Sequence, residues 1–193
     1  MNYLAHLALS GKNEEIIIGN YIGDSLKGIQ IENFPIQIQK GIKLHRLIDV
    51  FTDRHPEFLS AKRIFTPDFH KFSGVLVDIF FDHFLAVNFN KFHSIELQLF
   101  ASECYDVIQK NYSLLPDNAK RFYHYMVDKN ILFEYKNTNS IKMVLEGIYH
   151  RINFLIPVVD SHQVFIKNYN KIENCFMNFY PELKDECKNF LLA

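Results

Sequence analysis

Three polar side chains recur at one-turn intervals in residues 40–53, which read KGIKLHRLIDVFTD. On a helix, His45, Asp49 and Asp53 are spaced i, i+4 and i+8, so they share one face. Imidazole and carboxylate groups are ligands of hard or borderline divalent metals, and this row could therefore bind such an ion. The alternative, which spacing alone favours, is an exposed face with a His–Asp pair one turn apart.

A second group of polar residues lies in residues 75–87, which read VLVDIFFDHFLAV. A helix here is apolar nearly all round, which predicts a buried helix. It nevertheless contains Asp78, Asp82 and His83, and a buried carboxylate requires a cation or several donors. A metal, with Asp82 binding it or orienting a metal-bound histidine, is favoured over a buried salt bridge to Arg46 or Arg151.

Two further polar residues have apolar neighbours: His6 in YLAHLAL and Asp24 in GNYIGDSLKG. Each is ambiguous alone, because a lone buried histidine is usually structural and an aspartate between Gly and Ser is usually a cap or turn residue. Together with the two preceding groups, they place five carboxylates and three imidazoles within the first 83 residues. These are His6, Asp24, His45, Asp49, Asp53, Asp78, Asp82 and His83.

The elements that must position these side chains are helical in pattern along nearly the whole chain. Caps, prolines and apolar periodicity predict one all-α domain over residues 1–193. The predicted helices span residues 2–10, 14–26, 36–53, 56–65, 74–89, 94–112, 117–135, 140–154 and 160–180, with a last short helix starting at residue 181. Residues 75–81 could alternatively form a strand, because β-branched and aromatic residues dominate them.

Composition excludes several classes of protein. The 19 Phe and 10 Tyr among 193 residues can build a large core, and a net charge of −1 argues against nucleic-acid binding through bulk positive charge. No apolar run reaches the roughly 18 residues of a membrane helix, and the first residues do not resemble a signal peptide. Three scattered cysteines predict neither disulfides nor a zinc knuckle, which indicates the cytoplasm. Nucleotide-binding glycine loops and a nucleophile elbow are absent.

Four motifs occur here in the order found in the acyl carrier protein phosphodiesterase family: MNYLAHLAL, GNYIGDSLKG, GIKLHRLIDVFTD and DIFFDHFLA. The chain resembles that family over essentially its whole length, including residues 147–160. The resemblance implies an all-α fold of the HD-like, metal-dependent phosphohydrolase type. It also implies hydrolysis of the phosphodiester that joins 4′-phosphopantetheine to the serine of holo-acyl carrier protein. Manganese is the metal it implies, with Mg²⁺ or Fe²⁺ as alternatives.

The adjacent His-Asp pair that names the HD class is absent from this chain, which has His45-Arg46 and the reversed Asp82-His83 instead. This leaves open which carboxylates bind the metal directly. For the implied reaction, the expected metal ligands are His6, Asp24, His45, Asp82 and His83. The expected catalytic residues are Asp49 and Asp78, as general base or as support for the ligands, and Arg46, for the developing phosphoryl charge.

The implied partner is an acidic protein, for which a basic docking surface is expected. Residues 40–71 contain seven basic residues against four acidic ones, a balance that would steer such a partner and weaken with salt. An ordinary solvated face is the alternative. Two other functions stay open: an HD-like phosphohydrolase of nucleotides or other small phosphoesters, and a metal-free helical interaction protein with buried salt bridges. Neither nucleic acid nor a membrane is an expected partner.

Overall fold

The computed structural model describes residues 1–26, 31–151 and 157–193, and these residues form helices joined by short loops, without a strand. The all-α prediction is therefore confirmed, and residues 75–81 are helical. Within the described ranges no helix combines the length and the apolar character needed to cross a membrane. The predicted helix over residues 140–154 is described as far as Arg151, whose side chain, like residues 152–156, lies outside the described part.

The first half of the chain holds the helices that carry the candidate residues. They are α1 (Tyr3–Ala8), α2 (Glu14–Ile22), η1 (Gly23–Ser25), η2 (Ile31–Asn33), α3 (Ile36–Arg54), α4 (Pro56–Phe69), η3 (His70–Phe72) and α5 (Ser73–Val87). The second half of the chain supplies the remaining helices. Its helices are α6 (Phe89–Phe92), α7 (Leu97–Lys110), η4 (Tyr112–Leu114), α8 (Asp117–Asp128), α9 (Ile131–Glu134), α10 (Thr138–Arg151), η5 (Val158–Asp160), α11 (Ser161–Lys167) and α12 (Tyr169–Leu192).

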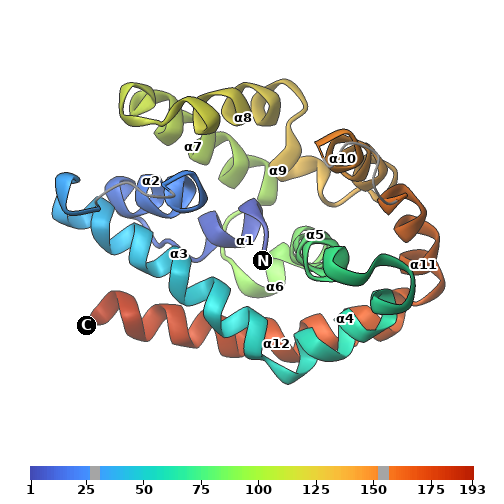
Figure 1. Cartoon of the computed structure of the whole chain (residues 1–193). Coiled ribbons are helices and arrows are strands. Elements are labelled where there is room, and N and C mark those ends of the chain that lie inside the picture. Colours follow the sequence, from blue (N-terminus) through green and yellow to red (C-terminus); the bar gives the residue numbers. More distant parts are fainter. Residues whose placement is uncertain (27–30, 152–156) are drawn as a thin grey trace.

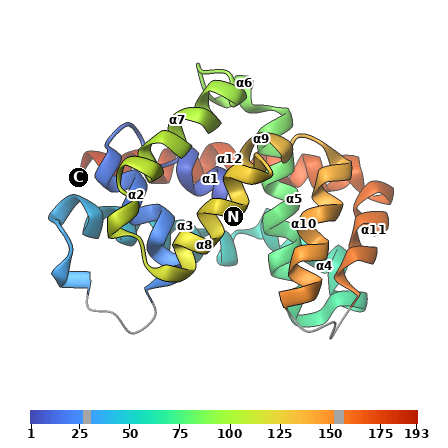
Figure 2. The same ribbon diagram turned by 90° about the horizontal axis from the view of Figure 1, so that it is seen from above.

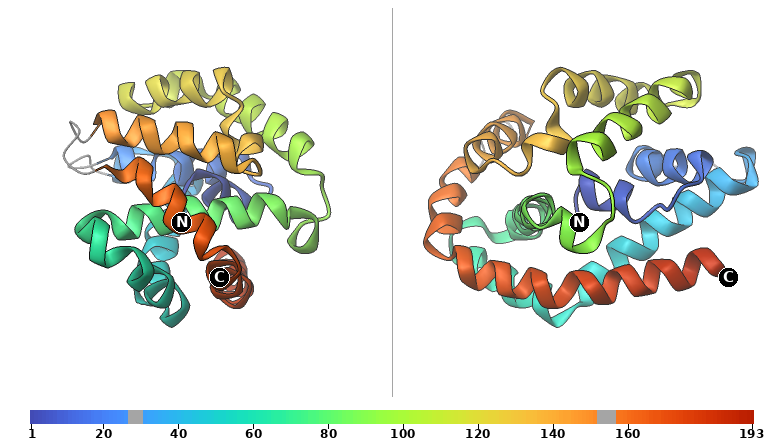
Figure 3. Two further views of the ribbon diagram at one scale, coloured as in Figure 1. Left: turned by 90° about the vertical axis from the view of Figure 1, so that its right-hand side faces the viewer. Right: turned by 180° about the vertical axis from the view of Figure 1, so that it is seen from behind.

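The chain begins near the centre of the molecule, where α1 lies beside α5 (Figures 1 and 2). The long helix α12 runs along one edge and contacts α3, α4 and α5, whereas α7 and α8 lie on the opposite edge (Figures 1 and 3). Helix α5 also contacts α4 and α10. The buried, largely apolar helix predicted for residues 75–87 is therefore the central helix of the fold.

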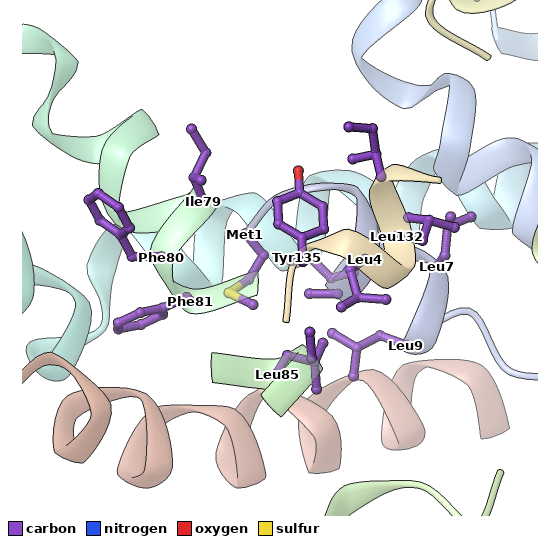
Figure 4. Packing of buried hydrophobic residues seen from close by; sticks show 14 of the residues in the cluster. Met1, Leu4, Leu7, Leu9, Ile79, Phe80, Phe81, Leu85, Leu132 and Tyr135 are labelled. Carbon is purple, nitrogen blue, oxygen red and sulfur yellow. The ribbon is translucent and has the colours of Figure 1, made fainter. Parts of the chain in front are cut away.

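The core around α5 is built largely from aromatic and aliphatic side chains. Figure 4 shows Leu4 of α1, Leu85 of α5 and Tyr135, just after α9, converging on one interior. Many of the Phe side chains pack in this core. The rings of Phe80 and Phe165, for example, stack with centroids 4.2 Å apart. Burial of this much apolar surface is the main stabilising contribution to the fold.

Helices α2 and α3 touch backbone to backbone. A Cβ atom at Gly19 would lie 2.1 Å from the carbonyl oxygen of Ile38, and one at Gly41 would lie 2.3 Å from that of Ile16. Only glycine permits this approach, which brings the middle of α2 against the first part of α3. The crossing thereby places Asn20 of α2 next to His45 of α3.

The predicted ends of three helices differ from the structure. Pro67 and Pro181 lie inside α4 and α12, where a helix end was expected. A proline inside a helix costs about 3 kcal/mol, and buried residues on both sides, such as Tyr180 and Leu183, offset that cost. Conversely, the helix expected over residues 117–135 is divided at Asn130, which has φ +46° and begins α9.

Candidate metal centre

Two imidazoles and two carboxylates converge at the junction of α1, η1 and α3. His6 Nε2 lies 3.3 Å from one oxygen of Asp49, and His45 Nε2 lies 3.3 Å from the other. Asp24 completes the group, because its Oδ1 is also 3.3 Å from His45 Nε2. Among the described residues, His6, His45 and Asp49 can each point a ligand atom at one place, with these atoms within 4.8 Å of one another.

The two imidazole rings are packed against each other and held from behind by Asn20. Their centroids are 4.1 Å apart, and both rings are buried. His6 Nδ1 lies 2.8 Å from the Asn20 side-chain oxygen, and His45 Nδ1 lies 2.8 Å from the Asn20 carbonyl oxygen. The Asn20 amide nitrogen donates to the carbonyl of His6 and to Ser10, which fixes the orientation of the amide.

These contacts determine which ring nitrogens carry hydrogen. Because Nδ1 of each histidine faces an oxygen that can only accept, Nδ1 must donate, and in the neutral ring Nε2 presents its lone pair. For His45 this atom is buried and has no hydrogen-bond partner among the described residues. A lone pair facing two carboxylates is unfavourable unless a proton or a metal ion lies between them. Oxygens that accept a hydrogen bond from the other nitrogen of a histidine in this way are typical of metal sites.

Charges in the group shift the protonation of both imidazoles. Burial disfavours a proton on His45, but the nearby carboxylates of Asp24 and Asp49 outweigh it and raise the pKa of His45. The pKa of His6 is lowered by burial and by the neighbouring His45. Burial acts to raise the pKa of Asp49, but His6 and His45 lower it overall. The carboxylates therefore attract one positive charge to the site, which a divalent ion could supply.

Comparisons with known proteins identify the relatives of this chain. A sequence model of the family described as acyl carrier protein phosphodiesterase matches residues 1–183. The chain belongs to the acyl carrier protein phosphodiesterase family. It is 31% identical over 189 residues to the acyl carrier protein phosphodiesterase of Escherichia coli O6:H1, covering 96% of this chain and 97% of that protein. Proteins of the same name from Enterobacter sp. (strain 638) and Photorhabdus laumondii are 31% and 27% identical, over 98% of this chain in each case and over 98% and 96% of those proteins. No solved structure matches the chain.

In this member of the acyl carrier protein phosphodiesterase family, Asp82 and Asp78 lie outside the cluster and hold the start of the chain. Asp82 accepts hydrogen bonds from the backbone N–H of Leu4 (2.8 Å), Asn2 (3.3 Å) and Ala5 (3.3 Å). It thereby caps α1, the helix that carries His6. The charged partner of Asp78 is the α-amino group of the first residue, 2.7 Å away, and not Arg46.

His83 and Arg46 also lie elsewhere. Both nitrogens of His83 are engaged: Nδ1 lies 2.8 Å from the carbonyl oxygen of Tyr135, and Nε2 lies 3.0 Å from the hydroxyl of Tyr169. Arg46 is exposed and lines a hollow with Val50 and Arg54 on the outer side of α3. The expected ligand His83 and the expected phosphoryl-binding Arg46 are therefore not brought to the cluster.

Of the residues predicted for the site, His6, Asp24, His45 and Asp49 meet. Asp53 is exposed one turn further along α3. Sequence reasoning missed Asn20, although one signal was available. Asn20 is a polar residue in a nearly apolar helical segment, EEIIIGNYI, and it is fully buried. A buried amide needs partners for all its polar atoms, and here the partners are the two histidines and Ser10.

Proposed function

We propose that this protein hydrolyses the phosphodiester that joins 4′-phosphopantetheine to the serine of holo-acyl carrier protein. Two observations support the proposal. Membership of the acyl carrier protein phosphodiesterase family extends over residues 1–183. The convergence of His6, His45, Asp24 and Asp49 supplies the mixed nitrogen and oxygen donors that metal-assisted phosphoester hydrolysis uses.

In this proposal a divalent metal ion, Mn²⁺ or else Mg²⁺ or Fe²⁺, is held by these four residues. The fit rests on the buried Nε2 of His45, which lacks a hydrogen-bond donor, and on carboxylate oxygens 3.3 Å from it. When bound, such an ion would polarise a phosphoryl oxygen and activate water near neutral pH. Asp49 takes the role of a ligand here instead of the general base suggested by the sequence, because each of its oxygens faces one imidazole.

The residues of the chain fix and expose the site. Asn20 keeps both imidazoles in the tautomer that can bind metal, and Asp82 fixes α1 so that His6 stays in place. Asp24 and Asp49 are 70% and 42% exposed, so a substrate can reach the carboxylate side of the cluster from solvent. The histidine side is buried, which limits competition from water there.

The carrier is proposed to approach over the basic residues of α4. Lys62 lies beside the start of α5, with its Nζ 4.0 Å from the position of a Cβ atom at Gly74. The next residue, Val75, lines a cavity that also contains Asp24. Lys62 and the adjacent, exposed Arg63 therefore lie on the side from which a long acidic partner could reach the cluster. Three buried cysteine thiols, all free, support action in the cytoplasm.

The deciding experiment is incubation with purified holo-acyl carrier protein and Mn²⁺, read by mass spectrometry for loss of the phosphopantetheine arm. We expect apo-carrier to accumulate with Mn²⁺ and to stop accumulating after chelation. His45→Ala should abolish the reaction, whereas His124→Ala, on the exposed surface of α8, should not. Hydrolysis of free nucleotides but not of carrier would favour a small-phosphoester hydrolase. Absence of bound metal and of any hydrolysis would favour a helical interaction protein.

A further inference from the structure

A cavity of about 400 Å³ opens next to the cluster, between α1, α5, α8 and α10. Asp24 forms part of its wall, and the same carboxylate lies 3.3 Å from His45 Nε2. A second hollow shares Asp24, Tyr3 and Phe122 with the first and extends to Arg121. A ligand with one end at the cluster can therefore place its other end in this cavity.

Apart from Asp24, Asn2 and Asp78, which pairs with the α-amino group of Met1, the cavity is lined largely by apolar side chains. The rings of Tyr3 and Phe122 stack with centroids 4.2 Å apart and form one side of it. Aliphatic side chains of Ile131, Val144 and Ile148 line it further in. Its volume lies in the range of small-molecule sites, and an apolar wall with a few polar groups is the usual character of such a site.

One nearly buried polar group in this wall lacks a partner. The side chain of Tyr135 is 2% exposed, and its hydroxyl makes no hydrogen bond with the described residues. Figure 4 shows the hydroxyl oxygen at the end of the ring that points away from Leu85 and Leu9. Because this hydroxyl opens onto the cavity and is free to donate or accept, a ligand with a hydrogen-bonding group can pair with it here.

We propose that this cavity binds the pantetheine arm of the substrate, an inference that rests on the proposed function. The arm joins its phosphate to a branched apolar segment, two amides and a terminal thiol. With the phosphate at the cluster, the branched segment would lie against the rings of Tyr3 and Phe122. The Tyr135 hydroxyl would donate to an amide oxygen, and the thiol end would lie among the side chains of α10. The serine and the carrier protein stay outside.

The inference is tested by filling the cavity from Gly147, which lines it and lies on α10. A Cβ atom there would be 3.7 Å from the Tyr125 hydroxyl, an ordinary contact, and leucine favours helix more than glycine does. Gly147→Leu should therefore fold. We expect it to raise the KM for holo-carrier by about tenfold or more, because arm contacts are lost. Hydrolysis of bis(p-nitrophenyl) phosphate, a diester without an arm, should change less than about twofold.

A second measurement does not depend on hydrolysis. Saturation-transfer NMR with free pantetheine should show transfer to the methyl protons of the ligand with the wild-type protein. The transfer should persist in Met143→Leu, a control on the exposed side of α10, and disappear in Gly147→Leu. No transfer to the wild-type protein, or an unchanged KM in Gly147→Leu, would overturn the inference. If neither diester is hydrolysed while pantetheine binds as expected, the proposed function fails and the cavity assignment stands.

Discussion

Gly23 and His45 are in contact so close that only glycine fits. A Cβ atom at Gly23 would lie 2.4 Å from Cγ of the His45 ring and 2.7 Å from its Cβ and Cδ2. The backbone at the end of α2 thus packs directly against the imidazole of His45, while the carbonyl oxygen of Asn20 accepts a hydrogen bond from its Nδ1. The position of His45 is therefore set by a missing side chain as much as by a hydrogen bond.

Gly23→Ala should displace the His45 ring from the cluster. We expect affinity for Mn²⁺ to fall by about 10- to 100-fold, the range seen when ligand orientation is lost, and hydrolysis to fall with it. Metal titration followed by EPR measures the first effect. Gly74→Ala is the matched control, because a Cβ there meets only the end of the flexible Lys62 side chain at 4.0 Å. Equal Mn²⁺ affinity in the two variants would contradict the assignment of His45 as a ligand.

Asn20→Ala should weaken metal binding without removing a ligand. His6 would lose the side-chain oxygen that keeps its Nδ1 protonated, whereas His45 would keep the backbone carbonyl of residue 20, so the affinity for Mn²⁺ should again fall by about 10- to 100-fold through His6. Truncating a buried amide also destabilises the fold, by about 1–3 kcal/mol. Asn88→Ala controls for that effect, because Asn88 is buried and donates to the carbonyl of Phe84, on a helix without a proposed ligand. The isothermal titration of both variants with Mn²⁺ separates stability from metal binding.

The fold class followed from local pattern because most helices are amphipathic or bounded by caps and prolines. Helix ends depended on tertiary packing, as at Pro181, where residues on both sides of the proline are buried and the helix continues. The i, i+4 spacing of His45 and Asp49 reflects a contact that the helix itself creates, with 3.3 Å between Nε2 and Oδ2. Such a contact is visible in sequence.

The contacts of the polar residues in the apolar segment 75–87 were not predictable from spacing in the same way. Asp82 could equally bind a metal, an arginine or a helix N-terminus, since each satisfies a buried carboxylate. The choice depended on where α1 lies against α5, which is a relation between residues about eighty positions apart. The role of Asn20 was hidden for a similar reason, because its partners come from α1 and α3 and not from its own helix.

Asp82→Asn should change how stability depends on pH. Burial raises the pKa of Asp82 to about 7, against hydrogen bonds from α1 that favour the charged form. The folded protein therefore holds a proton that the unfolded chain releases near pH 4. Its free energy of unfolding should fall by about 3 kcal/mol as pH rises from 4 to 7. The Asn variant lacks this slope, although it loses hydrogen bonds to α1 at every pH.

Urea unfolding of metal-free protein at several pH values from 4 to 8 measures this difference. Asp185→Asn, an exposed carboxylate on α12, serves as the control and should keep the wild-type slope. At pH 4, where Asp82 is neutral, Asp82→Asn should lower stability by about 1–3 kcal/mol, because the amide NH2 can only donate and replaces a hydroxyl oxygen that can still accept from the backbone donors. An identical pH slope in wild type and Asp82→Asn would show that another group titrates there.

Reversing the charges of Lys62 and Arg63 should weaken docking of the carrier but leave the chemistry intact. In Lys62→Glu with Arg63→Glu, we expect the KM for holo-carrier to rise by about tenfold while kcat changes less than about threefold, because these side chains do not contact the cluster. Raising the salt concentration should reduce the difference from wild type, since screening weakens attraction and repulsion alike.

Lys171→Glu with Lys188→Glu reverses two exposed charges on α12 and should leave KM unchanged. A similar rise of KM in both double variants would indicate that net charge, and not the surface of α4, attracts the carrier. An unchanged KM in the first variant would place docking on another face of the protein.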